Sequence, residues 1–384
     1  MTDNRYRRLP VGIQSFKVIR EENYLYVDKS DIVWNMVNLG DKYNYLSRPR
    51  RFGKSVLVDT LESYLEGRKD LFEGLKIMQL EKDWKHYPVI RLDMSRGGAN
   101  EETLRSYLNL RFKDYEEKYN ITPDPTAMLA DRFHAIIATA YKQTGLRVAV
   151  LIDEYDSPLQ HSWRTPEHEK CTGVYREVFA ILKADDEYEQ FVFITGITKF
   201  TQISLFSVLN NLSNISFTPE YAAICGITEE EIKENFMPEI NQMSEANNWS
   251  IHETHDRLKA YYDGYHFSRR NMVDVYNPYS LVNALKSKEI INFWASSGAT
   301  SLLPKFVDNA ELRMKSFENC RIMRNTLELS DVSGGGAELF LYQSGYLTIK
   351  DSDEFGYILG FPNEEVKQAL YEEGKGLLDW KRAE

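Results

Sequence analysis

Apolar runs and helix-like periodicities alternate along the first part of the chain, up to about residue 225. Residues 147–152 and 191–195 are continuous apolar runs, typical of strands buried on both faces, residues 43–47 form a short β-prone run and residues 88–94 alternate. Helical spacing of apolar residues occupies residues 55–65, 101–119, 126–142 and 173–183. Strands joined by long helical crossovers predict an α/β fold with a mainly parallel sheet covered on both sides, and a last strand is expected at residues 215–218.

The pattern changes after residue 225. Thr228 and Glu231 form a capping-box pattern that predicts the start of a helix. Further helices are expected at residues 252–262, 278–286 and 311–318, and at the charged tail 364–384. A loop at residues 333–336, a helix and two short strands, at 346–350 and 356–359, complete this part. Such strands behind a helix fit the wing of a winged-helix module, and they fit other small α+β units equally well.

The segment Ser47–Ser55, with the sequence SRPRRFGKS, contains the most informative motif. It follows a predicted strand and precedes a predicted helix, so free helix N–H groups can face an anion. Gly53 permits close backbone approach, Lys54 can reach the β- and γ-phosphates, and the Ser55 hydroxyl can bind Mg²⁺. Arg48 stands where the usual P-loop pattern has its first glycine. The strand and helix on either side nevertheless favour a phosphate-binding loop over an ordinary basic loop.

The whole turn is expected to contact the nucleotide. The arginines of the turn can add guanidinium contacts to the phosphates or belong to a solvated basic loop, and the sequence does not distinguish these readings. The residues expected to contact the cofactor are Arg48, Pro49, Arg50, Arg51, Phe52, Gly53, Lys54, Ser55 and Val56.

A second motif lies at the end of the apolar run 147–152, where Asp153 and Glu154 follow directly. A buried strand that ends in two acids places both carboxylates at the carboxyl edge of the sheet, where α/β folds bind ligands. We expect Asp153 to hold Mg²⁺ together with Ser55, and Glu154 to polarise the attacking water. Lys54 and Glu154 are therefore the candidate catalytic residues. Together the two motifs predict that the chain binds ATP or GTP.

Several blocks of the sequence resemble the AAA-ATPase-like family that is common in Bacteroidetes and other anaerobic bacteria. These blocks are residues 9–29, 47–55, 152–158, 193–211, 218–226 and 262–278. The resemblance implies an AAA-like P-loop core with ATP as the nucleotide. It also implies that arginine in place of the first glycine, at position 48, is typical of the family. It also implies that a polar residue at the end of the strand 191–195, Thr195 or Thr198, senses the γ-phosphate; an ordinary strand-end role fits equally.

The chain departs from this family at its carboxyl end. Relatives usually continue into a nuclease-like domain of the PD-(D/E)xK type, and this chain stops where that domain is expected to begin. The resemblance therefore implies no nuclease activity here, and a natural short form and a truncated form both fit. AAA-like sites are often completed by an arginine from a neighbouring subunit, which leaves a homo-oligomer open and nominates no residue for that role.

Composition narrows the class of protein. Apolar residues make up 42% and charged residues 27% of the chain, as in globular soluble proteins. No apolar stretch approaches the roughly 18 residues that cross a bilayer, and no apolar run follows the basic N-terminus as in a signal peptide. The three cysteines lack CxxC spacing and fit a reducing cytoplasm. The net charge of −11 disfavours a sequence-blind grip on nucleic acid.

Taken together, the sequence predicts an AAA-like P-loop core at residues 1–225, a helical lid at 226–300 and a small C-terminal α+β module, in winged-helix form or another, at 301–384. The predicted function is a Mg²⁺-dependent ATPase in the cytoplasm. The alternatives are a nucleotide-dependent switch that regulates a protein partner, and a DNA-associated protein, each with little intrinsic hydrolysis.

Overall fold

The computed structural model describes residues 8–124, 126–200, 212–296, 303–306, 317–330 and 336–380. The chain forms two compact units that do not follow the order of the sequence. The sheet unit comprises residues 30–47 and 58–215, and the C-terminal unit comprises residues 1–29, 48–57 and 216–384. The division into core, lid and C-terminal module at residues 225 and 300 stays a prediction.

The sheet unit is built on the parallel sheet that the sequence predicts. Its strands are β1 (Tyr43–Ser47), β2 (Val89–Asp93), β3 (Val148–Asp153), β4 (Glu189–Gly196) and β5 (Ser213–Asn214), in the order β2-β3-β4-β1-β5. Every neighbouring pair in this sheet is parallel. Because Ser47 pairs with Gly196 and Ile152 pairs with Ile194, the carboxyl ends of β1, β4 and β3 lie at one edge.

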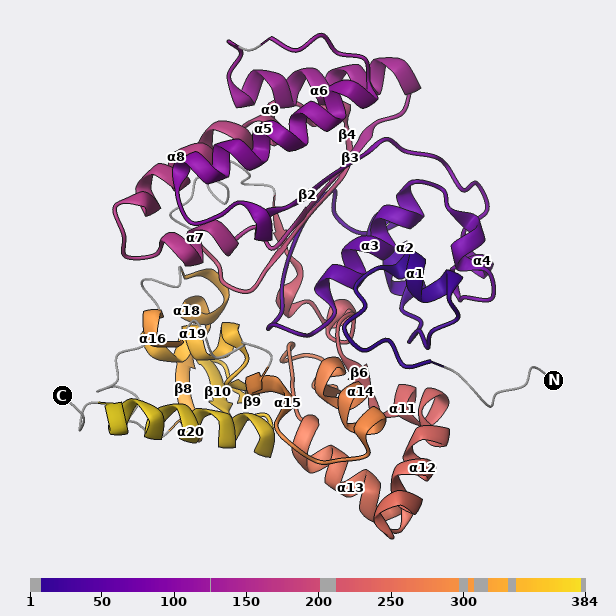
Figure 1. Cartoon of the computed structure of the whole chain (residues 1–384), viewed down its shortest axis with the longest axis vertical. Helices are drawn as coiled ribbons and strands as arrows, with labels where there is room; N and C mark the ends of the chain where they lie inside the picture. The colour runs from indigo at the N-terminus through magenta and orange to yellow at the C-terminus, as the bar shows by residue number, and fades with distance from the viewer. Residues whose placement is uncertain are drawn as a thin grey trace. The chain divides into compact units, whose positions relative to one another are not determined.

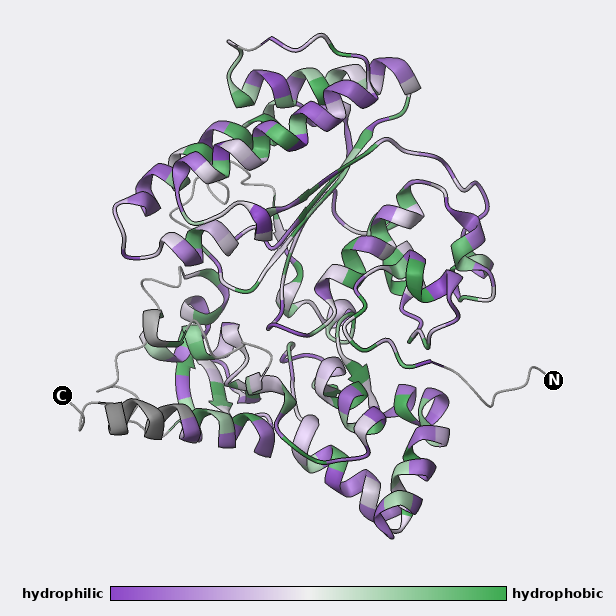
Figure 2. Cartoon of the chain, viewed as in Figure 1, coloured by the Kyte–Doolittle hydropathy of each residue, from purple (hydrophilic) through white to green (hydrophobic). Residues whose placement is uncertain are grey.

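Helices cover both faces of this sheet, as Figure 1 shows. On one face lie α5 (Glu101–Lys118), α6 (Leu129–Thr144), α8 (Glu167–Phe179) and, between β3 and α8, the short α7 (Ser157–Ser162). The other face carries α2 (Ser30–Asn38), α3 (Lys54–Leu65) and α4 (Ile77–Leu80). Figure 2 shows hydrophobic and hydrophilic residues alternating around α5 and α6, as amphipathic helices on a buried sheet require.

Two predicted elements of the sheet unit need correction. The strand expected at residues 215–218 is wrong: Ile215–Phe217 is a 3-10 helix, and the fifth strand is the shorter β5 before it. The Ser216 carbonyl accepts a hydrogen bond from the Arg48 side chain, and Pro219, which has no backbone N–H, follows three residues later. The β5 pairing with β1 therefore does not extend through these residues. The helix expected at residues 173–183 begins earlier, as α8, and continues after Ala180 as α9 (Ile181–Ala184).

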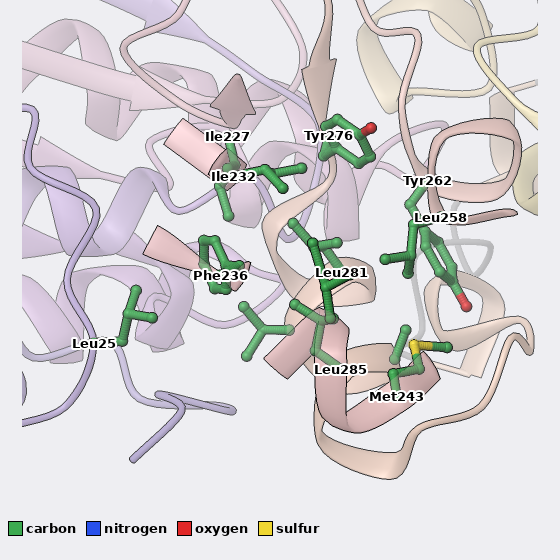
Figure 3. Packing of buried hydrophobic residues seen from close by; sticks show 13 residues of the cluster. Leu25, Ile227, Ile232, Phe236, Met243, Leu258, Tyr262, Tyr276, Leu281 and Leu285 are labelled. Carbon is green, nitrogen blue, oxygen red and sulfur yellow. The ribbon is translucent and has the colours of Figure 1, made fainter. Parts of the chain in front are cut away.

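The C-terminal unit contains a helical cluster with its own core. Its helices are α11 (Glu229–Asn235), α12 (Met237–Asn247), α13 (Ile251–Tyr262) and α14 (Pro278–Ser287), beside the antiparallel pair β6 (Ile227–Thr228) and β7 (Val275–Tyr276). The helix α1 (Phe16–Glu21) belongs to the same unit and contributes no residue to this core. The predicted capping box of Thr228 and Glu231 is confirmed. Figure 3 shows the buried core, in which Leu25 from the N-terminal segment joins Phe236, Leu258 and Leu281.

The remainder of this unit contains a small antiparallel sheet. Its strands are β8 (Cys320–Met323), β9 (Thr348–Ser352) and β10 (Gly356–Gly360), in the order β8-β10-β9. The helices are α15 (Phe293–Ser296), α16 (Leu303–Phe306), α18 (Arg324–Leu329), α19 (Gly336–Ser344) and α20 (Glu364–Trp380). The two predicted strands are confirmed, and β8 was not anticipated because its four residues carry only one buried side chain. The winged-helix interpretation stays a prediction.

Two expectations for this unit fall largely beyond the described residues: the helix at residues 311–318 and the loop at 333–336. Within the described part of the chain, no helix combines the length and the apolar composition that crossing a membrane requires.

Candidate functional site

The turn at residues 48–53 connects β1 directly to α3, as the P-loop interpretation requires. Arg51 and Gly53 adopt left-handed backbone conformations, with φ of 68° and 84°. Glycine adopts this conformation without steric cost, whereas Arg51 pays about 1 kcal/mol for it. Alternation of left- and right-handed residues turns successive N–H groups to one side, which is the backbone form that binds anions.

Lys54 begins α3, and its side chain folds back over the turn. The ammonium group is buried and donates hydrogen bonds to the carbonyl oxygens of Arg48 and Pro49, each at 2.9 Å. Beside it, Ser55 and Val56 are half-buried, and Gly53 is exposed. The turn therefore holds a buried cation next to accessible backbone.

The arginines of the turn differ sharply in their surroundings. Arg48 is only 1% exposed, and its Nη1 and Nη2 donate to the carbonyls of Ser216 (2.8 Å) and Tyr221 (2.9 Å). Its guanidinium lies 4.1 Å from the ring centre of Phe267, and burial lowers its pKa. The solvated-loop alternative is thus wrong for Arg48.

Arg50 is half-buried and Arg51 is exposed. The Arg51 guanidinium lies 4.9 Å from the ring centre of Tyr279, at the start of α14. Phosphate contact by these two side chains stays a prediction.

Phe52 is buried against the edges of two aromatic rings. Its ring centre lies 4.7 Å from that of Tyr265 and 5.5 Å from that of Phe267. Packing within the C-terminal unit thereby explains the aromatic residue in this turn. Nothing in the sequence marks these two residues as partners of Phe52 beyond their aromatic character.

The acidic edge at the end of β3 has a strained backbone. Asp153 is 3% exposed, and its Oδ1 accepts a hydrogen bond of 3.0 Å from the Glu154 backbone N–H. Glu154 is half-buried and left-handed, with φ of 48°. Such a backbone conformation persists mostly where the surrounding structure imposes it.

Asp156 fixes the loop that follows the neighbouring strand β4. Its Oδ2 accepts from the backbone N–H groups of Ile197 (3.0 Å) and Thr198 (2.6 Å), and from the Thr198 hydroxyl (2.7 Å). Although Asp156 precedes α7, its side chain makes no capping hydrogen bond to that helix. A Cβ on Gly196 would lie 2.5 Å from Asp156 Oδ1, so only glycine fits there.

Thr195 lies at the carboxyl end of β4 and is fully buried. Its hydroxyl donates to the carbonyl of Leu46 on β1, at 2.9 Å. The Thr198 hydroxyl is bonded to Asp156, as described above. Both candidate sensor residues therefore lie at the expected strand end, where they also tie neighbouring segments together.

The sheet register brings the two predicted motifs to one edge. β4 separates β1 from β3, all three strands are parallel, and Arg48 directly follows the last residue of β1. The sheet unit thus gathers Asp153, Glu154 and Thr195 at the edge where β1 ends and the turn at residues 48–53 begins.

A model of the family described as "AAA-ATPase_like: Predicted AAA-ATPase" matches residues 10–206, which include both motifs. The chain belongs to the AAA-ATPase-like family. Its fold and this membership make it a nucleotide-binding, ATPase-like protein. A relative from Azotobacter chroococcum mcd 1, described as "Uncharacterized protein in vnfD 5'region", is 32% identical over 375 residues, covering 95% of this chain and 69% of the relative.

Two solved structures show a weaker similarity to this AAA-ATPase-like chain. The Aeropyrum pernix ORC1 protein, solved in complex with DNA, aligns with a TM-score of 0.29 and 12% identity over 88% of this chain and 89% of its own. CDC6P from Pyrobaculum aerophilum aligns with a TM-score of 0.28 and 12% identity over 97% of each chain. At such low scores the family assignment rests on the sequence matches and on the sheet itself.

Proposed function

We propose that this AAA-ATPase-like protein binds ATP together with Mg²⁺ and hydrolyses it to ADP and phosphate. One observation carries the proposal: the turn with Lys54 leaves β1 at the sheet edge where β3 ends in Asp153 and Glu154. P-loop chemistry needs a phosphate-binding turn and an acidic strand end, and parallel strands deliver both to one edge.

The turn supplies the phosphate-binding groups. Lys54 now donates to two main-chain carbonyls, and a phosphate oxygen is a stronger, charged acceptor for the same ammonium group. The N-terminus of α3 adds a partial positive charge and backbone N–H groups. We assign cofactor contacts to Arg48, Pro49, Arg50, Arg51, Phe52, Gly53, Lys54, Ser55 and Val56, and to Thr195 at the end of β4.

Mg²⁺ fits the donor atoms that these motifs offer. The Ser55 hydroxyl and the Asp153 carboxylate are hard oxygen ligands, which Mg²⁺ prefers. Asp153 is held in place by the Glu154 N–H, which orients its carboxylate. When bound, the ion would neutralise phosphate charge, and these two residues are the ones that would hold it.

Glu154 is the proposed general base for the attacking water. It is half-buried next to Asp153, and its left-handed backbone sets its direction independently of the strand. General-base catalysis by a positioned carboxylate contributes about 10²–10⁴-fold to a rate. Lys54 would stabilise charge that develops on the transferred phosphoryl group.

The test is ATP affinity and ATP turnover measured on the same purified variants. Lys54→Ala should weaken ATP binding about 10–100-fold because a charge-assisted contact to phosphate is lost. Glu154→Gln should bind ATP about as tightly as the wild type. Its ATP turnover should be at least about 100-fold slower. Lys69→Ala and Glu102→Gln, which change exposed side chains elsewhere, serve as matched controls.

The outcomes separate the candidate functions. A wild type that does not bind ATP contradicts the proposal. Tight ATP binding with turnover that Glu154→Gln leaves unchanged would instead indicate a nucleotide-dependent switch.

We propose further that the protein lies in the cytoplasm, forms a homo-oligomer and acts with a DNA or protein partner. The reducing cytoplasm suits cysteines that are buried, as at positions 171 and 225, or half-buried, as at 320.

A further inference from the structure

Arg48 is a buried cation whose hydrogen bonds go to main-chain carbonyls. A buried charge is costly unless hydrogen bonds compensate it, and two guanidinium nitrogens do so by bonding Ser216 and Tyr221. The planar face of the same group lies over the Phe267 ring. All four residues belong to the C-terminal unit, so Arg48 attaches the first residue of the turn to that unit.

The next residues of the turn are seated by packing in the same unit. Phe52 contacts Tyr265 and Phe267 edge-on. Gly345 lies against Pro49 so closely that a Cβ on residue 345 would stand 2.6 Å from the Pro49 Cβ. The turn thus has two further supports besides the Arg48 hydrogen bonds.

These supports are joined to one another and to the small antiparallel sheet. The Tyr265 hydroxyl donates to the Gly345 carbonyl at 3.1 Å. His266 lies between the two aromatic residues in the sequence and is bonded to Thr348. Its backbone N–H donates to the Thr348 hydroxyl (2.7 Å), and that hydroxyl donates to the His266 carbonyl (3.0 Å). Thr348 is the first residue of β9. The seat of the turn is therefore a connected part of the C-terminal unit.

The pinned residues are also those that hold Lys54. Its ammonium group bonds the carbonyls of Arg48 and Pro49, the two residues fixed by the Ser216–Tyr221 carbonyls and by Gly345. If Arg48 loses its bonds, the carbonyls that position Lys54 lose their anchor. Preorganised binding groups gain affinity because less ordering remains to be done when the ligand binds.

We propose that Arg48 and Phe52 are positioning residues through which the C-terminal unit sets the conformation of the phosphate-binding turn and its affinity for the β- and γ-phosphates. The effect on phosphate affinity rests on the proposed function, whereas the support of the turn rests on the contacts of Arg48, Pro49 and Phe52. It assigns the Arg48 side chain to the support of the turn, and leaves its backbone among the groups that face the nucleotide.

The principal variant is Arg48→Met, which keeps a long side chain and removes the guanidinium. We expect ATP affinity to fall at least about 10-fold, whereas AMP, which lacks the β- and γ-phosphates, should bind within about twofold of wild type. Arg48→Lys should not restore affinity, since one ammonium cannot bridge two carbonyls and stack on a ring at once. Arg257→Met is the matched control, because Arg257 also lies over an aromatic ring, 4.3 Å from the centre of Trp249.

Gly345→Ala disturbs the second support of the turn, the close contact between Gly345 and Pro49. The added Cβ would displace Pro49, and φ of +93° at residue 345 strains any side chain. Gly145→Ala controls for that strain, since Gly145 is left-handed (φ +68°) with nothing within 4 Å of the added Cβ. We expect Gly345→Ala to lower ATP affinity and Gly145→Ala to lower only stability. This pair also decides the question if Arg48→Met does not fold.

Hydrogen exchange of the turn, measured without nucleotide on the full chain, separates the two proposals. Amides of residues 50–56 should exchange about 10-fold faster in Arg48→Met than in wild type. Faster exchange with unchanged ATP affinity would overturn the positioning role while leaving ATP binding intact. A wild type without ATP affinity would overturn the proposed function and, with it, the role assigned to Arg48. Equal exchange in both proteins would show that Arg48 does not hold the turn.

Discussion

Arg48 and Asp156 are buried polar side chains beside turns at the carboxyl edge of the sheet, and they fix those turns over very different distances along the chain. Arg48 donates to carbonyls at residues 216 and 221 and stacks on Phe267, so its turn depends on segments far away in sequence. Asp156 accepts from N–H groups of Ile197 and Thr198, at the end of the adjacent strand. Both side chains bond to backbone groups, and Asp156 also accepts from the side chains of Thr198 and Gln160.

The difference has a consequence for how each turn responds to change. The Asp156 turn is built within the sheet unit and should follow the stability of the sheet. The Arg48 turn is built within the C-terminal unit, so nucleotide affinity should depend on residues outside the P-loop motif. The predictions below test this contrast, beginning with the largest effect.

Removing the Asp156 carboxylate should cause the largest loss of stability. Asp156→Ala leaves the N–H groups of Ile197 and Thr198 buried without their acceptor, which should lower the free energy of unfolding by about 3–5 kcal/mol. Urea unfolding measures this loss. Asp83→Ala, at an exposed acid of the same unit, should change it by less than about 0.5 kcal/mol. Equal losses in the two variants would refute the role given to Asp156.

Glu189, at the amino end of β4, is a buried carboxylate with far fewer donors than Asp156. Its Oε2 accepts from the Tyr43 hydroxyl at 2.7 Å, and burial raises its pKa to about 8. A raised pKa means that the folded state holds a proton that the unfolded state releases above about pH 4.5. Stability should therefore be full below that pH and fall as pH rises toward 8.

The expected size of this effect between pH 5.5 and 8 is about 2–3 kcal/mol of unfolding free energy. Glu189→Gln keeps an acceptor for Tyr43 and cannot ionise, so most of that loss should disappear. Urea unfolding of both proteins at the two pH values gives the comparison. An unchanged slope in the variant would assign the pH dependence to other groups, such as Asp263 and Glu365, whose pKa values burial raises to about 7.

Tyr265→Phe isolates one link in the seat of the phosphate-binding turn. The variant keeps the ring that contacts Phe52 and loses the hydrogen bond to the Gly345 carbonyl. We expect a loss of about 1 kcal/mol in unfolding free energy and a small weakening of ATP binding, about twofold. Thermal unfolding and ATP titration measure the two. A loss of ATP affinity larger than that of Arg48→Met would place the main support at Tyr265.

The smallest expected effect is a gain of stability. Glu154→Gly removes a side chain from a left-handed residue, φ 48°, which should raise the free energy of unfolding by up to about 1 kcal/mol. The same change should abolish turnover because the proposed base is gone. Calorimetry beside an ATPase assay checks both. A loss of stability in this variant would mean that the Glu154 side chain supports the fold.

Strands β1 to β4, most helices and the sequences of both motifs were predictable because each carries a local signal. β3 is a run of apolar residues that ends in acids, and α11 begins with a capping box. The parallel direction of neighbouring strands also followed from the helical crossovers. The sheet edge at which the two motifs meet could thus be predicted before any coordinates.

The supports of the turns could not be predicted, because they depend on tertiary contacts without a local pattern. Nothing around Phe267 or Gly345 marks them as neighbours of residues 48–52. Asp156 stands at the N-cap position of α7 and makes no capping hydrogen bond there, whereas its carboxylate bonds the loop after β4. The 3-10 helix at Ile215–Phe217 replaced a predicted strand for the same reason, since the Ser216 carbonyl is used by Arg48.

The central claim is that the turn with Lys54 and the acid at the end of β3 act on one nucleotide. It is tested most directly by ATP affinity with and without Mg²⁺, in wild type, in Asp153→Asn, and in Asp93→Asn, which alters the acid paired with Asp153 on β2. We predict that Mg²⁺ tightens ATP binding about 10-fold or more in wild type and Asp93→Asn, and about twofold or less in Asp153→Asn. Undiminished Mg²⁺ enhancement in Asp153→Asn would contradict the claim.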